Sequence, residues 1–116
     1  MKFMLMLASD PSLEPAPDSP DFGAYMGEWA AYSAALEEIG ALVGGEALQG
    51  TETATTVQVR NGERVVTDGP FIESKEVLGG FYLIDVADLD AALGWAARIP
   101  NARFGSVEVR PVMTFE

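Results

Sequence analysis

Four ionisable side chains that could take part in catalysis or binding lie close together in one short stretch. Residues 65–76 read Val-Val-Thr-Asp-Gly-Pro-Phe-Ile-Glu-Ser-Lys-Glu. Gly69 and Pro70 predict a sharp turn there, because glycine accepts positive φ and proline fixes φ while donating no hydrogen bond. Paired carboxylates can hold different pKa values and so act as acid and base. We therefore take Asp68 and Glu73 as the candidate catalytic residues.

The candidate ligand-binding residues add further acids, one cation and two aromatic walls: Glu46, Phe71, Lys75, Glu76 and Tyr82. A buried acid beside Lys75 would have its pKa shifted by burial and by charge. If residues 73–76 are extended, Glu73 and Lys75 project to one side and Glu76 to the other. These groups cannot then all line one pocket. The alternative interpretation is a solvated run of charges that follows a structural turn.

Composition removes several kinds of site. The chain has no cysteine and no histidine, so thiolate chemistry, disulfides and imidazole catalysis are excluded. A general base must be a carboxylate, a tyrosine or a perturbed lysine. We expect no cofactor and no metal; a divalent ion held by carboxylates is a third alternative, although no EF-hand-like spacing exists.

Charge and hydropathy bear on partners and location. The net charge of −11 repels phosphate backbones and anionic lipid, so we expect neither a nucleic-acid nor a membrane partner. The apolar run of residues 3–8 is too short to span a bilayer and lacks the features of a signal peptide. We therefore expect a cytoplasmic protein. The length of 116 residues predicts one domain over residues 1–116.

The first half of the chain predicts a strand, a loop and a helix. Residues 1–8 suit a central strand covered on both faces. Residues 9–19, rich in proline, form a loop that is either a lid or a simple connection. Ser19 is a good N-cap for a helix that Gly40 would stop. Its predicted apolar stripe is Phe22, Tyr25, Met26, Trp29, Leu36 and Ile39, and Gly23 and Gly27 favour close packing.

Glycines and a tight turn organise the middle of the chain. Residues 41–48 predict a short strand, in which Gly44 and Gly45 indicate a bulge or a close backbone approach. Asn61-Gly62 between β-branched runs predicts a two-residue hairpin, which pairs Val57 with Val66.

The last third predicts a buried strand, a helix and a final strand. Residues 77–86 form the buried strand, and Asp88 caps a helix that Pro100 stops. The predicted apolar stripe of that helix is Leu89, Ala92, Leu93, Ala96 and Ile99. In residues 106–115, Val107, Val109, Met113 and Phe115 share one face, and Pro111 demotes part of the strand to an edge.

This order predicts an α+β fold with two helices on one face of an antiparallel sheet. Two helices cannot cover both faces of a sheet whose strands are this apolar. We therefore expect a homodimer in which two sheets pack together.

With these residues in place, the chain resembles the DGPF branch of the YCII-related (YciI-like) family. The similarity covers nearly the whole chain and rests on the following residues: 43–46 with Leu48, 67–71, Glu73 with Lys75-Glu76, 78–84, 88–92, Trp95-Ala96 and 108–111. The resemblance implies a ferredoxin-like subunit that dimerises into an α/β barrel. It implies no settled biochemical role. Enzymatic activity in the YciI branch was inferred from a histidine and an aspartate that meet in a pocket, and this sequence has no histidine.

Two main functional hypotheses follow. The first is a protein that binds a small molecule in a pocket between sheet and helices, with weak acid–base enzymatic chemistry as an extension. The second is a regulatory interaction module, because members of the DGPF branch are often encoded beside extracytoplasmic-function sigma factors. An acidic surface could dock such a basic partner.

Overall fold

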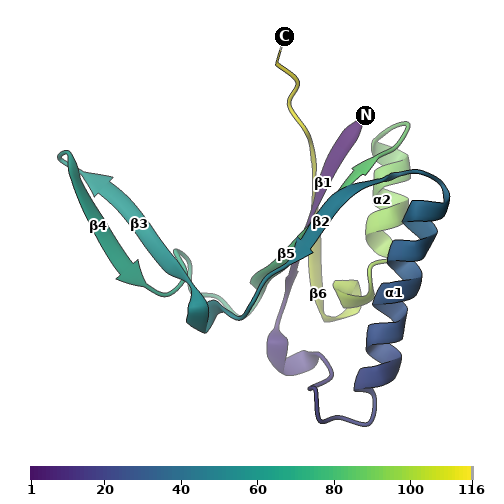
Figure 1. The fold of residues 1–116 in the computed structure, drawn as a ribbon, viewed down its shortest axis with the longest axis horizontal. Helices are drawn as coiled ribbons and strands as arrows, with labels where there is room; N and C mark the ends of the chain where they lie inside the picture. Colours follow the sequence, from purple (N-terminus) through teal and green to yellow (C-terminus); the bar gives the residue numbers. More distant parts are fainter. Residues whose placement is uncertain (116) are drawn as a thin grey trace.

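The computed structural model describes residues 1–115 as a four-stranded antiparallel sheet with two helices on one face (Figure 1). The strand order is β2-β5-β1-β6, and a separate hairpin is formed by β3 and β4. The elements are β1 (Lys2–Ser9), α1 (Phe22–Glu38), β2 (Leu42–Ala47), β3 (Thr55–Arg60), β4 (Glu63–Asp68), β5 (Val77–Asp85), α2 (Leu89–Ala97) and β6 (Gly105–Pro111). Short 3₁₀ turns lie at Pro11–Leu13, Thr51–Thr53 and Pro100–Phe104. Two βαβ halves therefore interleave around β1 and β5, which is the ferredoxin-like arrangement and confirms the predicted α+β class.

The core lies between the sheet and the helices. Phe3, Leu5 and Leu7 alternate along β1 on the helix-facing side, and they pack with Leu36 of α1 and Ile84 of β5. Side chains of a strand alternate between faces, so the intervening residues of β1 point the other way. Local sequence and packing agree here, because the buried set has the period of two that a strand requires.

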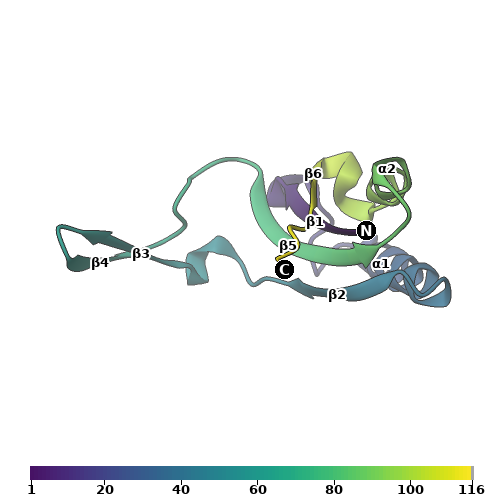
Figure 2. The same cartoon turned by 90° about the horizontal axis from the view of Figure 1, so that it is seen from above.

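The opposite side of the sheet is an open face, made of Met4, Met6, Phe81 and Leu83. Register places Met4 beside Leu83 and Met6 beside Phe81, and all four side chains are half-buried. Both helices lie on the other side of the sheet (Figure 2). The prediction that β1 is central is confirmed, and the cover of its second face, predicted to come from a partner subunit, stays a prediction. The run of apolar residues is still explained if the second cover comes from outside the chain.

The hairpin of β3 and β4 projects away from the rest of the molecule as an arm, residues 55–68 (Figures 1 and 2). Val57 pairs with Val66, as predicted, and Asn61 and Gly62 have φ of 53° and 77°. The radius of gyration is 16.3 Å, against about 13 Å for a compact chain of this length. The arm therefore gains little burial within its own chain.

Helix α1 differs in detail from its predicted stripe. It begins at Phe22, one residue after Asp21, so Ser19 and Pro20 precede it. Tyr25, Tyr32 and Leu36 are buried, whereas Met26 and Ile39 are largely exposed. The prediction missed Tyr32, although it lies seven residues after Tyr25 and therefore on the same face of the helix. Gly40 has φ of 70° and ends the helix as predicted.

The prediction of close packing at Gly23 and Gly27 is wrong. A Cβ added at either position would meet nothing within 4 Å. The two glycines therefore lie on an open side of α1.

The second helix and the last strand begin close to where they were predicted, but their later residues differ from the prediction. The Asp88 carboxylate accepts a hydrogen bond from the Ala91 amide at 2.9 Å, which confirms the cap. Ala92, Ala96 and Ile99 are buried as expected, whereas Leu89 and Leu93 are about half-exposed. Strand β6 ends at Pro111, so Met113 and Phe115 do not continue its inward face and lie exposed. Within residues 1–115, neither helix is long and apolar enough to cross a membrane.

Candidate ligand-binding cleft

A cleft of about 930 Å³ lies between α1 and the β2–β5 side of the sheet. Trp29 and Ser33 of α1 and Tyr82 of β5 contribute to its walls. Glu14, in the loop after β1, and Asn101, in the 3₁₀ turn before β6, also line it. Segments that are distant in sequence therefore build one concave surface.

Aromatic packing holds the walls. The rings of Trp29 and Tyr82 are nearly parallel, with centroids 6.4 Å apart. Tyr32 meets Tyr82 edge-on at 5.3 Å, and the Ser33 hydroxyl is hydrogen-bonded to the Tyr82 hydroxyl at 2.8 Å. Edge and offset contacts of this kind favour one ring orientation. The aromatic wall is therefore formed before any ligand arrives.

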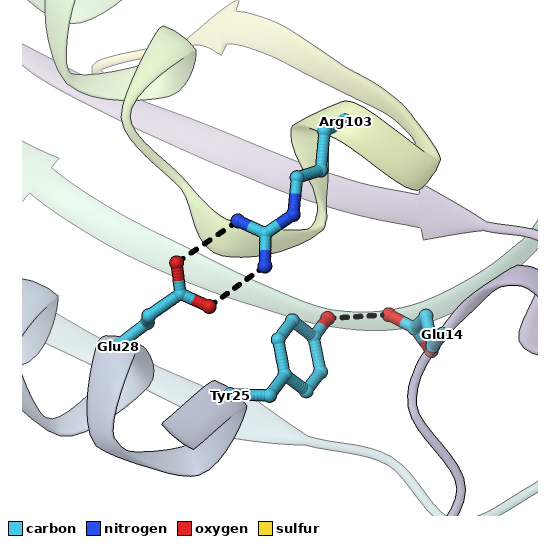
Figure 3. A network of polar contacts seen from close by, with 4 residues as sticks. All are labelled: Glu14, Tyr25, Glu28 and Arg103. Atoms are coloured by element: carbon cyan, nitrogen blue, oxygen red, sulfur yellow. Dashed lines mark hydrogen bonds and ion pairs between the residues drawn. The ribbon is translucent and has the colours of Figure 1, made fainter. Parts of the chain in front are cut away.

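Glu14 and Tyr25 are joined by a hydrogen bond at the loop side of the cleft (Figure 3). The Tyr25 hydroxyl donates to Oε1 of Glu14 at 2.8 Å. Burial, and next the bond to Glu14, raise the pKa of Tyr25 to about 12. At neutral pH Tyr25 is a hydrogen-bond donor and not a base. The carboxylate of Glu14 is the hydrogen-bond acceptor of this pair.

A bidentate ion pair ties the Pro100–Phe104 turn to α1 (Figure 3). Nη1 and Nη2 of Arg103 donate to the two carboxylate oxygens of Glu28 at 3.0 and 2.7 Å. The guanidinium bond lowers the pKa of Glu28. Arg103 also lies 4.8 Å over the Phe104 ring and 5.6 Å over the Tyr25 ring. These contacts position the turn that carries Asn101.

Asn101 is a buried polar residue of the lining whose carbonyl oxygen lacks a partner. It is 3% exposed, and its Oδ1 accepts no hydrogen bond from the described residues. Such an unpaired buried group costs about 1–3 kcal/mol. Buried polar groups are otherwise almost always paired in proteins.

Two glycines let β2 and β5 approach closely beside the cleft. A Cβ on Gly45 would lie 2.7 Å from the carbonyl oxygen of Phe81, and one on Gly80 would lie 2.6 Å from that of Glu46. The register also shifts between Leu42 and Gly44. The predicted bulge and the predicted close approach are both present.

Of the sequence-predicted residues, Glu46 and Tyr82 line the cleft. Phe71 and Glu76 line a neighbouring hollow of about 610 Å³ at the base of the arm. The Phe71 side chain is 73% exposed there, and Glu76 Oε1 accepts a hydrogen bond from the Ser106 hydroxyl at 2.9 Å. The predicted ligand-binding residues are therefore divided between two hollows.

Asp68, Glu73 and Lys75 line neither of these hollows. Asp68 is exposed at the end of β4, and Glu73 and Lys75 are exposed in the irregular connection 69–76. The assumption that residues 73–76 alternate as a strand is wrong, because β5 begins only at Val77. Hydrogen bonds from Ser12, with a smaller contribution from the charge of Lys75, lower the pKa of Asp10. The catalytic assignment of Asp68 and Glu73 stays a prediction.

The sequence prediction missed most residues of the cleft, among them Glu14, Tyr25, Trp29 and Asn101. Tyr25 and Trp29 were assigned to a core stripe, and nothing in the local pattern distinguishes a core aromatic from one at a cleft. The loop containing Glu14 was named as a lid or a connection. Asn101 carries no sequence signal. Within residues 1–115, no cluster of acidic side chains is arranged to hold a metal ion.

The topology and the helix-covered sheet define a ferredoxin-like α+β fold of the dimeric α/β-barrel type. The chain belongs to the YCII-related domain family, whose model matches residues 1–116. An uncharacterised protein of Rhizobium meliloti (strain 1021) is 50% identical over 68 residues, or 57% of this chain and 55% of that protein. The chain thus spans just over half the length of that curated relative.

A solved structure supports the same fold. It is that of 5-chloro-2-hydroxyhydroquinone dehydrochlorinase (TftG) from Burkholderia phenoliruptrix AC1100, in complex with 2,5-dihydroxybenzoquinone. The TM-score is 0.53 at 15% identity, over 97% of this chain and 94% of that chain. At this identity the similarity shows the fold alone.

Proposed function

We propose that the protein binds a small organic molecule in the cleft between α1 and the β2–β5 side of the sheet. The observation that carries this proposal is the cleft itself, about 930 Å³ in volume and walled by packed Trp29 and Tyr82. Ligand pockets typically measure about 300–1,000 Å³ and combine aromatic walls with a few polar groups. The dehydrochlorinase with the same fold is itself an enzyme, and its structure is a complex with a small quinone, 2,5-dihydroxybenzoquinone.

Acid–base chemistry is an extension of this proposal. Glu14 is our candidate carboxylate for this chemistry, because the hydrogen bond that Tyr25 donates to one of its oxygens fixes its orientation. Asp68 and Glu73 keep their proposed catalytic role only if the connection 69–76 moves toward a bound ligand. A protein carrying Asp68→Asn that binds and turns over every ligand like the wild type would remove Asp68 from the site.

Amide and indole NMR spectra with a fragment library test the binding proposal. We expect fragments that bind to shift the Trp29 indole, Ser33, Tyr82 and the Asn101 side-chain amide together. The valines of the arm, Val57 and Val66, provide internal controls and should not move. A library that shifts none of the cleft resonances, or shifts only those of the arm, contradicts the proposal.

We also propose that two copies form a homodimer through their open faces. The half-buried side chains of Met4, Met6, Phe81 and Leu83 form a contiguous apolar surface that no described element covers. Apolar sheet faces of this kind mark association sites. The cytoplasmic location stays part of the proposal, and a chain without cysteine is compatible with it.

A second candidate function is a regulatory interaction module that docks a sigma factor. The observation that favours it is the arm, whose Val57, Val59 and Val66 share one exposed face. An acidic chain could also steer a basic partner. Co-sedimentation of purified protein with a purified extracytoplasmic-function sigma factor tests this. Separate migration of the two proteins at low salt would argue against it.

A further inference from the structure

The charged groups that line the cleft all have the same sign. Three residues of the lining are charged: Glu14, Glu37 and Glu46. Glu46 pairs with Phe81 of the open face, so its side chain projects away from the helices and the carboxylates of the cleft are those of Glu14 and Glu37. In the described chain, no lysine or arginine contributes to the lining. Arg103 is nearby, but both of its terminal nitrogens are bonded to Glu28. A ligand entering this cleft meets carboxylates without compensating cations, in a chain of net charge −11.

The unpaired Oδ1 of Asn101 is an independent observation that indicates a ligand. Asn101 is only 3% exposed, and it lines the cleft. A rotation of the carboxamide about its terminal bond would be needed to bring this buried oxygen to the cleft surface, where a ligand O–H or N–H could donate to it. Pairing of this kind would remove the cost of the buried acceptor. The expected ligand therefore carries at least one hydrogen-bond donor.

The aromatic rings favour the same kind of ligand as the carboxylates. Trp29 and Tyr82 contribute partly exposed rings to the lining, and the faces of such rings attract cations. The ring of Tyr25, which also lines the cleft, is only 6% exposed and already has Arg103 5.6 Å over it. The rings of Trp29 and Tyr82 also offer a flat apolar surface to a planar ligand. The charge of the carboxylates, the unpaired acceptor of Asn101 and the ring surface thus all favour a cationic, planar ligand that carries a hydrogen-bond donor.

We propose that the cleft selects an arylalkylamine that is positively charged at neutral pH, with its ammonium group beside Glu14 and a hydroxyl or N–H donor at Asn101. This inference rests on the proposed binding function and adds the class of ligand. The proposal excludes carboxylates and phosphates as preferred ligands, because a site for them requires lysine, arginine or free backbone N–H groups.

Three probes that share a phenol ring test the charge preference: tyramine, neutral 4-ethylphenol and 3-(4-hydroxyphenyl)propionate. We expect tyramine to bind at least about tenfold more tightly than 4-ethylphenol at low salt, and the anion to bind most weakly. Added salt should reduce the difference, because it screens the charges. NMR titration of the cleft resonances measures all three affinities.

The outcomes separate the ligand class from the binding function. Equal or tighter binding of the anion at the cleft overturns the amine proposal and leaves small-molecule binding intact. If neither these probes nor the fragment library shifts the cleft resonances, the proposed function itself fails.

Matched variants assign the preference to named residues. Glu14→Gln keeps an acceptor for Tyr25 and removes the charge, so tyramine should bind several-fold more weakly while 4-ethylphenol is unchanged. Glu38→Gln makes the same charge change at an exposed position of α1 outside the lining and should leave tyramine binding as in the wild type. Equal tyramine affinities of Glu14→Gln and wild type would overturn the role of Glu14.

Asn101 has its own pair of variants. Asn101→Leu removes the acceptor and should weaken tyramine and 4-ethylphenol by similar factors, whereas Asn101→Asp keeps an acceptor and should retain tyramine binding. If Asn101→Leu does not fold, Asn101→Asp still decides, because weaker tyramine binding by that folded variant would contradict the proposal. Unchanged binding by a folded Asn101→Leu protein would also contradict it.

Discussion

Tyr25 shows how one residue can couple the cleft to stability at alkaline pH. Its pKa is raised from 10.0 to about 12, first by burial and then by the bond to Glu14. The folded state therefore binds more protons than the unfolded state between these two pH values. The stability due to neutral Tyr25 is complete below pH 10 and is lost as the pH rises toward about 12.

We predict that Tyr25→Phe flattens this alkaline loss of stability. Phenylalanine has no proton to lose, so the urea midpoint should fall less between pH 10 and pH 12 than in the wild type. A residual loss is expected, because burial also raises the pKa of Tyr32. Urea unfolding measured at several alkaline pH values checks this. Parallel pH profiles for the two proteins would contradict it.

Gly105 shows where the chain tolerates no side chain. A Cβ at this position would overlap the carbonyl oxygen of Ala8 and lie 2.5 Å from Cα of Ser9. Overpacking against backbone costs about 1–3 kcal/mol. We predict that Gly105→Ala lowers the free energy of unfolding by that amount, as measured by urea denaturation.

The matched control is Gly94→Ala in α2, where an added Cβ meets nothing within 4 Å. Alanine is favoured over glycine inside a helix by about 0.5–1 kcal/mol, so this variant should be more stable than the wild type. A Gly105→Ala protein as stable as Gly94→Ala would show that β1 and β6 do not approach as closely as described.

At the scale of the element, Asp88 illustrates a local signal that the structure confirms. Its side chain satisfies the Ala91 amide at the start of α2. We predict that Asp88→Ala costs about 1 kcal/mol of stability, because the amide loses its acceptor. Asp88→Asn keeps an acceptor at the N-cap and should cost much less. Equal urea midpoints for the alanine and asparagine variants would show that the cap contributes nothing.

The elements whose signals are local were predicted well, and the ends set by distant partners were not. Asn61-Gly62 determines the hairpin register because both residues take positive φ, and this needs no tertiary contact. In contrast, Met113 and Phe115 fit an alternating strand in sequence but extend beyond the last pairing of β6 with β1. A strand ends where its neighbour ends, and that information lies elsewhere in the chain.

At the scale of the whole molecule, the open face predicts association. Met6 lies near its centre, opposite Phe81 on β5 and Glu108 on β6. We predict that the wild type sediments with twice the chain mass of 12.4 kDa. Met6→Glu should shift it toward the monomer, because burying an unpaired carboxylate in a sheet interface is costly.

Leu93→Glu is the matched control for association. It changes an exposed leucine of α2, on the helical side of the sheet, and should leave the dimer intact. Circular dichroism confirms that both variants are folded. Sedimentation of the wild type as a single species of 12.4 kDa would contradict the homodimer.

The sequence by itself determined the α+β class, the order of the strands and helices, the hairpin register and the cap of α2. These features follow from periodicity, capping and turn chemistry, which act over a few neighbouring residues. The residues around Asp-Gly-Pro-Phe attracted attention because their chemistry is visible in one stretch.

Only the tertiary structure decided where the cleft lies. The Glu14–Tyr25 bond joins a loop to a helix, and the Ser33–Tyr82 bond joins a helix to a strand. The burial of Asn101 without a partner depends on how its turn packs against α1 and β1. A local pattern carries no record of such contacts, because they depend on which distant segments the fold places side by side.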